Sequence, residues 1–415
     1  MQYLFTERAH LMCPRMCFGI AVTVPRPFDA DRIRAALPRL SDAHPFLNAL
    51  LGYEAEGNRY YYRVTDRPRT ELFLYNLRIA GADAPEVMDE YRQLTGREWD
   101  LFEEGFLKLA AWPAGDGTCF LLVFHHLLAD GRGALMLARE LADLYALDRE
   151  PVRVGERLIA SVSDLPADSR LPFMSRVLIK WANKTHKKEG RALTYPEYRL
   201  IADEFLKEDP IHYKVVRTGP DELERVLEKC RARRVTVNDW LVAKMLAEEN
   251  TRKVIMACDL RDCLECFREG ALGNYATAFS VEIRSNEKDP FRLAEKVRAQ
   301  VARKMSRPRE KYLVLQCYAA LDPEVLDAAF AACRGGFPGK AGRFVGSVFF
   351  GFGAAAGRSV TNLGSIGSGS ISSGLFIPPA SPAVRTTWGV LTVNGVMTVC
   401  AAGRGCGSAS ENEQG

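Results

Sequence analysis

A buried strand, a polar turn and an amphipathic helix follow one another between residues 119 and 145, and this succession constrains the fold more than any other stretch. Residues 119–124 read CFLLVF, a short continuous apolar run of the kind found in strands that are covered on both faces. Beyond Gly133, apolar residues recur at the spacing of one core-facing helical stripe, at Ala134, Leu137, Ala138, Leu141 and Tyr145. The stretch therefore predicts a strand that leads through a turn into a helix, as in α/β proteins.

The turn has the sequence HHLLADG and places His125, His126 and Asp130 where the strand leaves its sheet. A neutral imidazole can accept a proton from a hydroxyl or amine that attacks a carbonyl, which contributes roughly a hundred- to ten-thousand-fold in rate. We expect Asp130 to be held by an arginine from elsewhere in the chain and so to orient the turn. We expect Gly131 to adopt a backbone conformation that a Cβ would disfavour.

Metal binding is the alternative use of paired histidines. The chain has 6 histidines, and none stands in the HxH or HxxxH spacing that would bring zinc ligands together. Cys263 and Cys266 form a CxxC, but no second pair or nearby histidine completes a zinc site, so we expect free thiols. The sequence therefore predicts no metal site.

The order and spacing HHxxxDG resemble the active-site motif of an acyltransferase superfamily. Its members include chloramphenicol acetyltransferases, peptide-synthetase condensation domains, plant acyl-CoA acyltransferases and bacterial alcohol acyltransferases. The resemblance implies an α/β (α+β) fold of two chloramphenicol acetyltransferase-like lobes, each a mixed sheet with helices. It also implies that an active-site tunnel runs between the lobes. The candidate catalytic residues are His126 as the general base, His125 in an orienting role, and Asp130.

Further segments resemble the family in the same order along the chain. They are residues 28–37 with HPFL at 44–47, 99–102, 106–110, 236–241, DLR at 259–261 with Gly273-Asn274, and TNLG at 361–364. The resemblance implies that Arg261 pairs with Asp130, and burial would make the loss of either partner costly. Thr361 and Asn362 are candidates for contact with the substrate or its oxyanion.

The organisation that we expect is two related lobes joined by a crossover. The N-terminal lobe covers residues 1–165, the crossover 166–212 and the C-terminal lobe 213–400. Residues 401–415 are mostly small and polar, which predicts a disordered tail and a second lobe that is partly missing or replaced. Pro38 should kink or shorten the helix expected over 31–40. Other expected elements are strands at 16–24, 59–64, 107–112, 253–258 and 276–283, helices at 85–94, 221–231, 237–249 and 290–304, and a strand pair at 390–399.

Composition favours an enzyme of the cytoplasm. The chain has 415 residues, of which 47% are hydrophobic and 26% charged, enough to bury sizeable cores. Its start lacks a basic region followed by an apolar one, and no run reaches the ~18 apolar residues of a membrane span. The 11 cysteines are irregularly spaced, as expected in a reducing compartment.

The net charge of +4 is compatible with the phosphates of coenzyme A or an acidic carrier protein, and too small to argue for nucleic acid. One local concentration of charge lies at residues 176–191, where Lys180, Lys184, Lys187 and Lys188 alternate with apolar residues that include Trp181. We favour a solvated crossover helix here. Peripheral contact with a membrane, or with an acidic partner, is the alternative.

These features together predict an acyltransferase without a bound cofactor. An acyl-coenzyme A or acyl-carrier-protein thioester would be the co-substrate, and an alcohol or amine would be the acceptor. Two alternatives stay open: a noncatalytic scaffold that binds acyl groups or a carrier protein, and a stand-alone condensation enzyme of the peptide-synthetase type. The oxyanion donor is not identified by the sequence.

Overall fold

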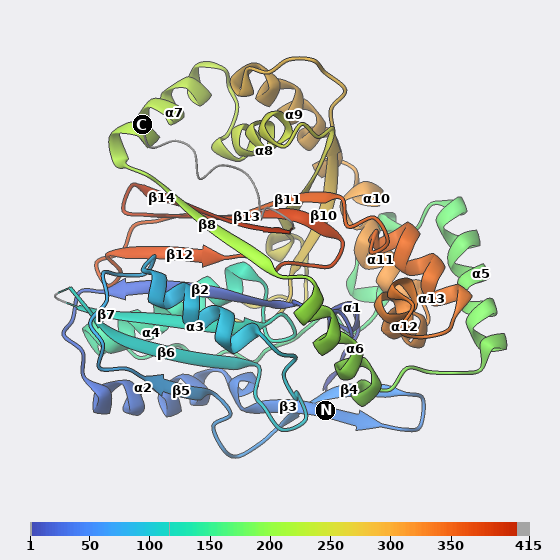
Figure 1. The fold of residues 1–415 in the computed structure, drawn as a ribbon, viewed down its shortest axis with the longest axis horizontal. Coiled ribbons are helices and arrows are strands. Elements are labelled where there is room, and N and C mark those ends of the chain that lie inside the picture. Colours follow the sequence, from blue (N-terminus) through green and yellow to red (C-terminus); the bar gives the residue numbers. More distant parts are fainter. Residues whose placement is uncertain (1, 116, 405–415) are drawn as a thin grey trace.

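The computed structural model describes residues 2–115 and 117–404, which form two large sheets and one small sheet with helices around them (Figure 1). The first large sheet has the strand order β12-β2-β7-β6-β5 and contains both antiparallel and parallel pairs. The second, in the order β10-β9-β11-β13-β14-β8, is also mixed. The mixed α/β architecture predicted from the sequence is therefore confirmed.

The elements have the following bounds. The first sheet is made of β2 (Cys17–Val24), β5 (Glu71–Leu74), β6 (Leu107–Ala114), β7 (Gly117–His125) and β12 (Ser373–Ile377). The second is made of β8 (Ile211–Thr218), β9 (Lys253–Asp259), β10 (Ala276–Glu282), β11 (Gly357–Ile366), β13 (Val384–Val393) and β14 (Val396–Arg404). The small sheet is made of β1 (Gln2–Tyr3), β3 (Ala49–Glu54) and β4 (Arg59–Val64).

The helices are α1 (Arg8–Leu11), α2 (Ala30–Ala43), α3 (Pro85–Thr95), α4 (Gly131–Leu147), α5 (Phe173–Glu189), α6 (Tyr195–Glu208), α7 (Pro220–Ala232), α8 (Val237–Glu248), α9 (Pro290–Met305), α10 (Pro308–Lys311), α11 (Leu313–Ala320), α12 (Pro323–Arg334) and α13 (Lys340–Val345). A π-helical turn, Gly346–Phe350, follows α13. Within the described residues, no helix is both long and apolar enough to cross a bilayer. Helix α2 runs through Pro38 to Ala43, so Pro38 does not shorten the helix, and the predicted kink stays a prediction.

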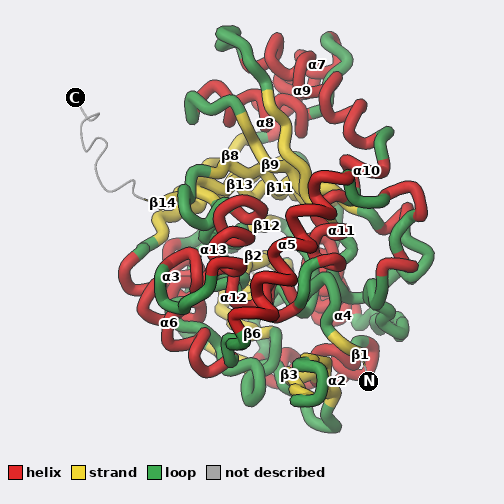
Figure 2. The backbone as a smooth tube through the Cα atoms, turned by 90° about the vertical axis from the view of Figure 1, so that its right-hand side faces the viewer, coloured by secondary structure: helices red, strands yellow, loops and turns green. Residues whose placement is uncertain are grey.

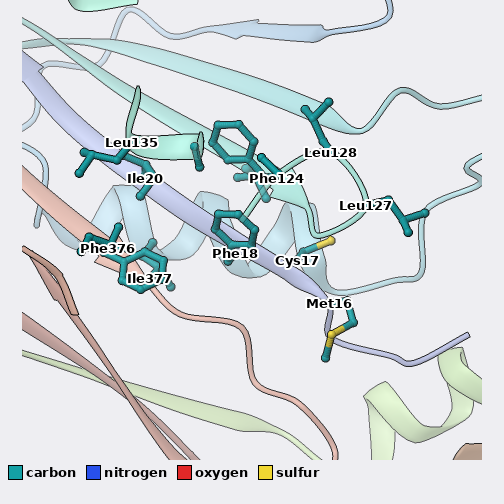
Figure 3. Packing of buried hydrophobic residues seen from close by; sticks show 14 of the residues in the cluster. Met16, Cys17, Phe18, Ile20, Phe124, Leu127, Leu128, Leu135, Phe376 and Ile377 are labelled. Atoms are coloured by element: carbon teal, nitrogen blue, oxygen red, sulfur yellow. The ribbon is translucent and has the colours of Figure 1, made fainter. Parts of the chain in front are cut away.

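Strand β7 is the central element of the first sheet because every one of its residues is buried. It pairs with β2 on one side and β6 on the other, as its unbroken apolar sequence requires. Phe124 stacks on Phe18 of β2 with ring centroids 5.4 Å apart, and Phe376 of β12 meets Phe18 edge-on at 6.2 Å (Figure 3). This core supports the histidine turn at the end of β7.

One strand from the second half of the chain belongs to the sheet of the first half. β12 pairs antiparallel with β2, with Phe376 opposite Ile20, and forms the edge of the first sheet on the side of the second sheet in Figure 1. The division into lobes at residues 165 and 213 stays a prediction, and the sheets themselves are interlocked by this strand.

The disordered tail predicted from residue 401 overlaps the end of strand β14. Residues 401–404 form the end of β14 and pair with β8, where Arg404 lies opposite Ile211. The buried guanidinium of Arg404 donates hydrogen bonds to the carbonyls of Pro382, Val384 and Ala380. The prediction of disorder is therefore wrong for these residues, and its remainder, 405–415, lies outside the described part of the chain.

Candidate active site

His126 lies in the turn after β7 and is held by Asn274, which precedes β10. The Nδ2 atom of Asn274 donates to the backbone carbonyl of His126 at 2.7 Å, and its Oδ1 atom lies 2.8 Å from the Nδ1 atom of His126. A carbonyl can only accept, so the amide orientation is fixed and Nδ1 must carry the imidazole proton. The lone pair of the neutral ring is therefore on Nε2, which forms no hydrogen bond with any described residue.

Aromatic rings enclose the imidazole of His126, which is half-buried rather than on an open turn. His10 of α1 stacks on it with ring centroids 4.6 Å apart and an angle of 23° between the planes. Phe18 meets it edge-on at 5.2 Å. Burial lowers the pKa of His126 below its ordinary value, while hydrogen bonding and the nearby charge of Asp130 oppose this shift. The ring is therefore neutral at pH 7, as a general base must be.

Asp130 is a fully bonded carboxylate at the start of α4. Arg261 donates from Nη2 to Oδ1 at 2.8 Å and from Nη1 to Oδ2 at 3.0 Å, which confirms the predicted ion pair. The backbone N–H groups of Gly133 and Tyr275 donate to the same carboxylate at 2.9 Å each. With its oxygens occupied in this way, Asp130 orients the turn and does not exchange protons with a substrate.

Leu363 of β11 packs directly against Gly131. A Cβ on Gly131 would lie 2.6 Å from Cδ2 of Leu363. Gly131 has an ordinary helical backbone at the first residue of α4, so the conformational reason that we expected is wrong. The glycine with the unusual backbone is Gly273, whose φ of +148° allows its carbonyl to accept from the N–H of Asp130 at 3.1 Å.

His125 is a core residue, 2% exposed, at the end of β7. Its Nδ1 atom accepts a hydrogen bond from the backbone N–H of Leu127 at 3.3 Å, and its ring lies near Trp99 and Phe106. Burial, with a smaller effect of His126, lowers the pKa of His125 to about 3. His125 therefore shapes the turn, and its grouping with His126 as a catalytic residue is not supported by its position.

Thr361 and Asn362 lie on β11, but the contact of this strand with the motif is made by Leu363. The side chain of Asn362 accepts from the backbone N–H of Gly364 at 2.9 Å, at an irregularity in the pairing of β11 with β13. Within the described residues no hydrogen bond joins Thr361 or Asn362 to the turn of His126. Their role toward an oxyanion stays a prediction.

Two cavities lie elsewhere in the described structure. One is lined by residues that include Arg15, Cys17, Tyr91 and Glu98, and the other by residues that include Asp83 and Arg217. Neither is lined by His126, so the tunnel at this residue stays a prediction. In residues 2–115 and 117–404 no cluster of histidine, cysteine and carboxylate side chains could hold a metal ion.

Sequence analysis missed two residues of the site. Asn274 was matched to the family only as part of a GN pair, and a loop asparagine carries no further signal in a single sequence. His10 had no signal at all, because the stack on His126 is created by tertiary structure. A buried ion pair between Arg8 and Asp327 of α12, with Nε to Oδ1 at 2.8 Å, holds α1 in the place that makes this stack.

Comparison with known sequences gives limited matches. No model of a known protein family matches the chain. Bacitracin synthase 1 of Bacillus licheniformis is 24% identical over 306 residues, which is 70% of this chain and 6% of the relative. A probable non-canonical nonribosomal peptide synthetase of Salinispora arenicola is 34% identical over 122 residues, 29% of this chain and 1% of the relative. The chain thus spans only a small part of these curated relatives.

Comparison with solved structures covers nearly the whole chain. The first condensation domain of the calcium-dependent antibiotic synthetase superposes with a TM-score of 0.59 at 14% identity, over 97% of this chain and 91% of that domain. The chain has the condensation-domain fold. Polyketide synthase associated protein 5 from Mycobacterium tuberculosis, at 14% identity, gives a TM-score of 0.58 over 99% of this chain and 93% of its own.

The same fold also occurs in a domain named for another reaction. The epimerization domain from the third module of tyrocidine synthetase B superposes with a TM-score of 0.53 at 15% identity, over 96% of this chain and 88% of that domain. The resemblance seen in the sequence is confirmed as a fold, and the reaction must be argued from the site.

Proposed function

We propose that this protein is an acyltransferase in which His126 is the general base. The observation that carries the proposal is the pair of hydrogen bonds with Asn274, which leaves the Nε2 lone pair of a neutral imidazole unoccupied. Nε2 takes the proton of an amine or alcohol acceptor. At the same time, the nitrogen or oxygen of this acceptor forms a bond to the carbonyl carbon of a thioester. The carbon–sulfur bond then breaks, and the proton passes to the departing thiolate.

The donor that we propose is a thioester of coenzyme A or of an acyl carrier protein. Matches to peptide synthetases support a carrier-bound donor and an amine acceptor, because amide bonds are what such enzymes form. The proposed protein residues for this step are His126 as base, Asn274 as the residue that sets its tautomer, and Asp130 with Arg261 as the pair that holds the turn. Thr361 and Asn362 remain candidates for contact with the oxyanion.

A second candidate function is a noncatalytic scaffold that binds acyl groups or a carrier protein. The observation in its favour is that His10 stacks on the ring of His126 and covers one of its faces. The two candidates differ in turnover and not in binding, so they can be separated directly.

The experiment is a thiol-release assay with a panel of acyl-coenzyme A and acyl-carrier-protein donors, each with and without amines and alcohols. We expect release that depends on an acceptor, with the acylated acceptor identified by mass spectrometry. Asn274→Leu should abolish most turnover without weakening donor binding, since it removes the tautomer lock. Asn286→Leu, at an exposed position ahead of α9, is the matched control. Donor binding by the natural protein without release for any acceptor would establish the scaffold instead.

A further inference from the structure

Helix α5 exposes an apolar stripe that no other part of the described chain resembles. The side chains of Phe173, Met174, Val177 and Trp181 are 68%, 63%, 45% and 47% exposed. Every other described helix or strand exposes at most one large apolar side chain. Apolar groups gathered in this way on one element mark a surface that is covered when the protein works.

The same face of α5 carries cations without partners. Residues 172–188 contain no aspartate or glutamate. The exposed cations of this segment take part in no ion pair among the described residues, in contrast to many arginines elsewhere; they are Arg176, Lys180, Lys184, Lys187 and Lys188. Glu189 ends the helix, and its carboxylate accepts from the backbone N–H groups of Lys340 and Ala341. The face therefore attracts anions.

The neighbouring helix α13 extends this face. Trp181 meets Phe344 of α13 edge-on with ring centroids 4.8 Å apart, and the two helices lie side by side in Figure 2. Val348, in the π-helical turn after α13, is 59% exposed, and the cations Lys340 and Arg343 are exposed as well. Together α5 and α13 form what we call the α5 face, which lies at the margin of the molecule in Figure 1.

The composition of the α5 face distinguishes between two kinds of partner. Protein interfaces are enriched in arginine and depleted in lysine, whereas lysines predominate among the cations of α5. Helices that lie in the plane of a membrane surface combine Phe, Trp and Leu on one side with Lys or Arg beside them, and they prefer anionic lipids. Phe173, Val177 and Trp181, four residues apart, form a stripe along one side of the helix.

We propose that the α5 face binds the surface of an anionic lipid membrane, with the apolar side chains of α5 in the interfacial region and its lysines at the headgroups. This binding uses none of the residues proposed for acyl transfer. It would deliver the enzyme to acyl donors or acceptors that reside in the lipid, and the attachment would weaken as salt screens the charges.

The experiment is co-sedimentation of the purified full chain with vesicles of phosphatidylcholine alone, and of phosphatidylcholine mixed equally with phosphatidylglycerol. We expect partition into the anionic vesicles only, reversed by salt. The double variant Lys184→Glu/Lys188→Glu should lower partition by about tenfold or more, and Phe173→Ser/Val177→Ser by about tenfold. All four positions are exposed, so folding should be retained.

The matched controls lie outside α5: Arg225 is on α7, Lys288 precedes α9, and Leu77 is in the loop between β5 and α3. Arg225→Glu/Lys288→Glu changes the net charge by the same amount, and Leu77→Ser removes an equally exposed apolar side chain. Both should keep partition within about twofold of the natural protein. Equal loss in these controls, equal binding to neutral vesicles, or no vesicle binding would overturn the proposal. If the protein binds an acidic carrier protein through the same lysines but binds no vesicles, the partner of the α5 face is a protein and the membrane proposal is wrong.

Discussion

His126 is half-buried and His44 fully buried, and their surroundings drive their pKa values in opposite directions. Around His126 there are rings and one neutral amide, and burial lowers its pKa. His44, 0% exposed, lies 2.6 Å from Oε2 of Glu140 and 3.6 Å from Oε1 of Glu156. Burial also opposes its protonation, but the hydrogen bond with Glu140 and the ion pair with Glu156 outweigh this and raise its pKa to about 9.

The opposite pKa shifts show which of the two histidines can act as a base. An imidazole with a raised pKa is already protonated at pH 7 and has no lone pair to offer, so His44 serves as a cation. Its partner Glu140 lies on α4, and His44 caps the end of α2, so this pair ties the motif helix to its neighbour. His126, in the turn before α4, is kept neutral by burial. The charged histidine thus belongs to the packing of α4, and the neutral histidine belongs to the site.

We expect the largest effects from variants of His126 and His44, and each variant should lose a different property. His126→Ala should lower turnover by about a hundred- to ten-thousand-fold with a small change in melting temperature, because it removes the base. His44→Gln should lower melting temperature and leave turnover per folded molecule nearly intact. Thiol release and thermal unfolding measured on both variants check this. Equal losses of turnover in both would remove the distinction and the assignment of His126.

The ion pair of Asp130 with Arg261 should be next in size. Removing one partner of a buried pair costs about 3–5 kcal/mol, since the other is left uncompensated. Asp130→Asn and Arg261→Ala should each lower melting temperature and turnover, and the double variant should lose less than the sum. Arg261 also pairs with Asp259, at 2.9 Å. Arg132→Ala is the control, because Arg132 pairs with Asp259 at 2.8 Å but is mostly exposed. Additive losses in denaturant unfolding would mean that the pair does not act as a unit.

Much of this arrangement could be predicted from the sequence where the signal is local. The apolar run at 119–124 is inside β7, the stripe from Ala134 is inside α4, and the motif led to the pairing of Asp130 with Arg261. These features depend on periodicity and on the order of residue types, both of which a single chain displays.

What could not be predicted depends on contacts between distant segments. His44 enters the sequence analysis only as part of HPFL at 44–47, and only the fold brings two glutamates to it. Residues 401–404 looked like the start of a tail, but pairing with β8 and the bonds of Arg404 make them strand. The reason for Gly131 was misjudged in the same way, because Leu363 arrives from a strand far along the chain.

The pH dependence of stability tests the two environments together. His44 has a folded pKa of about 9 above an unfolded value of about 6.5, so its contribution is complete below pH 6.5 and is lost as pH rises through 9. The contribution is of the order of 3 kcal/mol. His125, with a folded pKa of about 3, acts oppositely and costs stability as pH falls below 6.5.

We expect the gap in melting temperature between the natural protein and His44→Gln to be widest near pH 6 and to close above pH 9. Thermal unfolding of both proteins across this range is the measurement. The exposed His212, changed to Gln, should leave the whole profile unaltered. A gap that stays constant across the range would mean that His44 is not a cation in the folded protein.

The smallest effect concerns His10, which we regard as a positioning residue. Its stack on His126 should contribute about 0.5–1.5 kcal/mol, so His10→Ala should lower kcat/KM by roughly two- to tenfold. Losing the ring also admits water to His126, whose pKa would rise toward its ordinary value as burial is relieved. The acidic limb of the pH profile of kcat/KM should then move to higher pH, because more of the base is protonated at a given pH. His10→Phe keeps a flat ring at the same place and should leave both the rate and the limb nearly unchanged. If His10→Ala lowers the rate but the limb does not move, the stack contributes packing alone and the rest of the burial around His126 keeps its ring neutral.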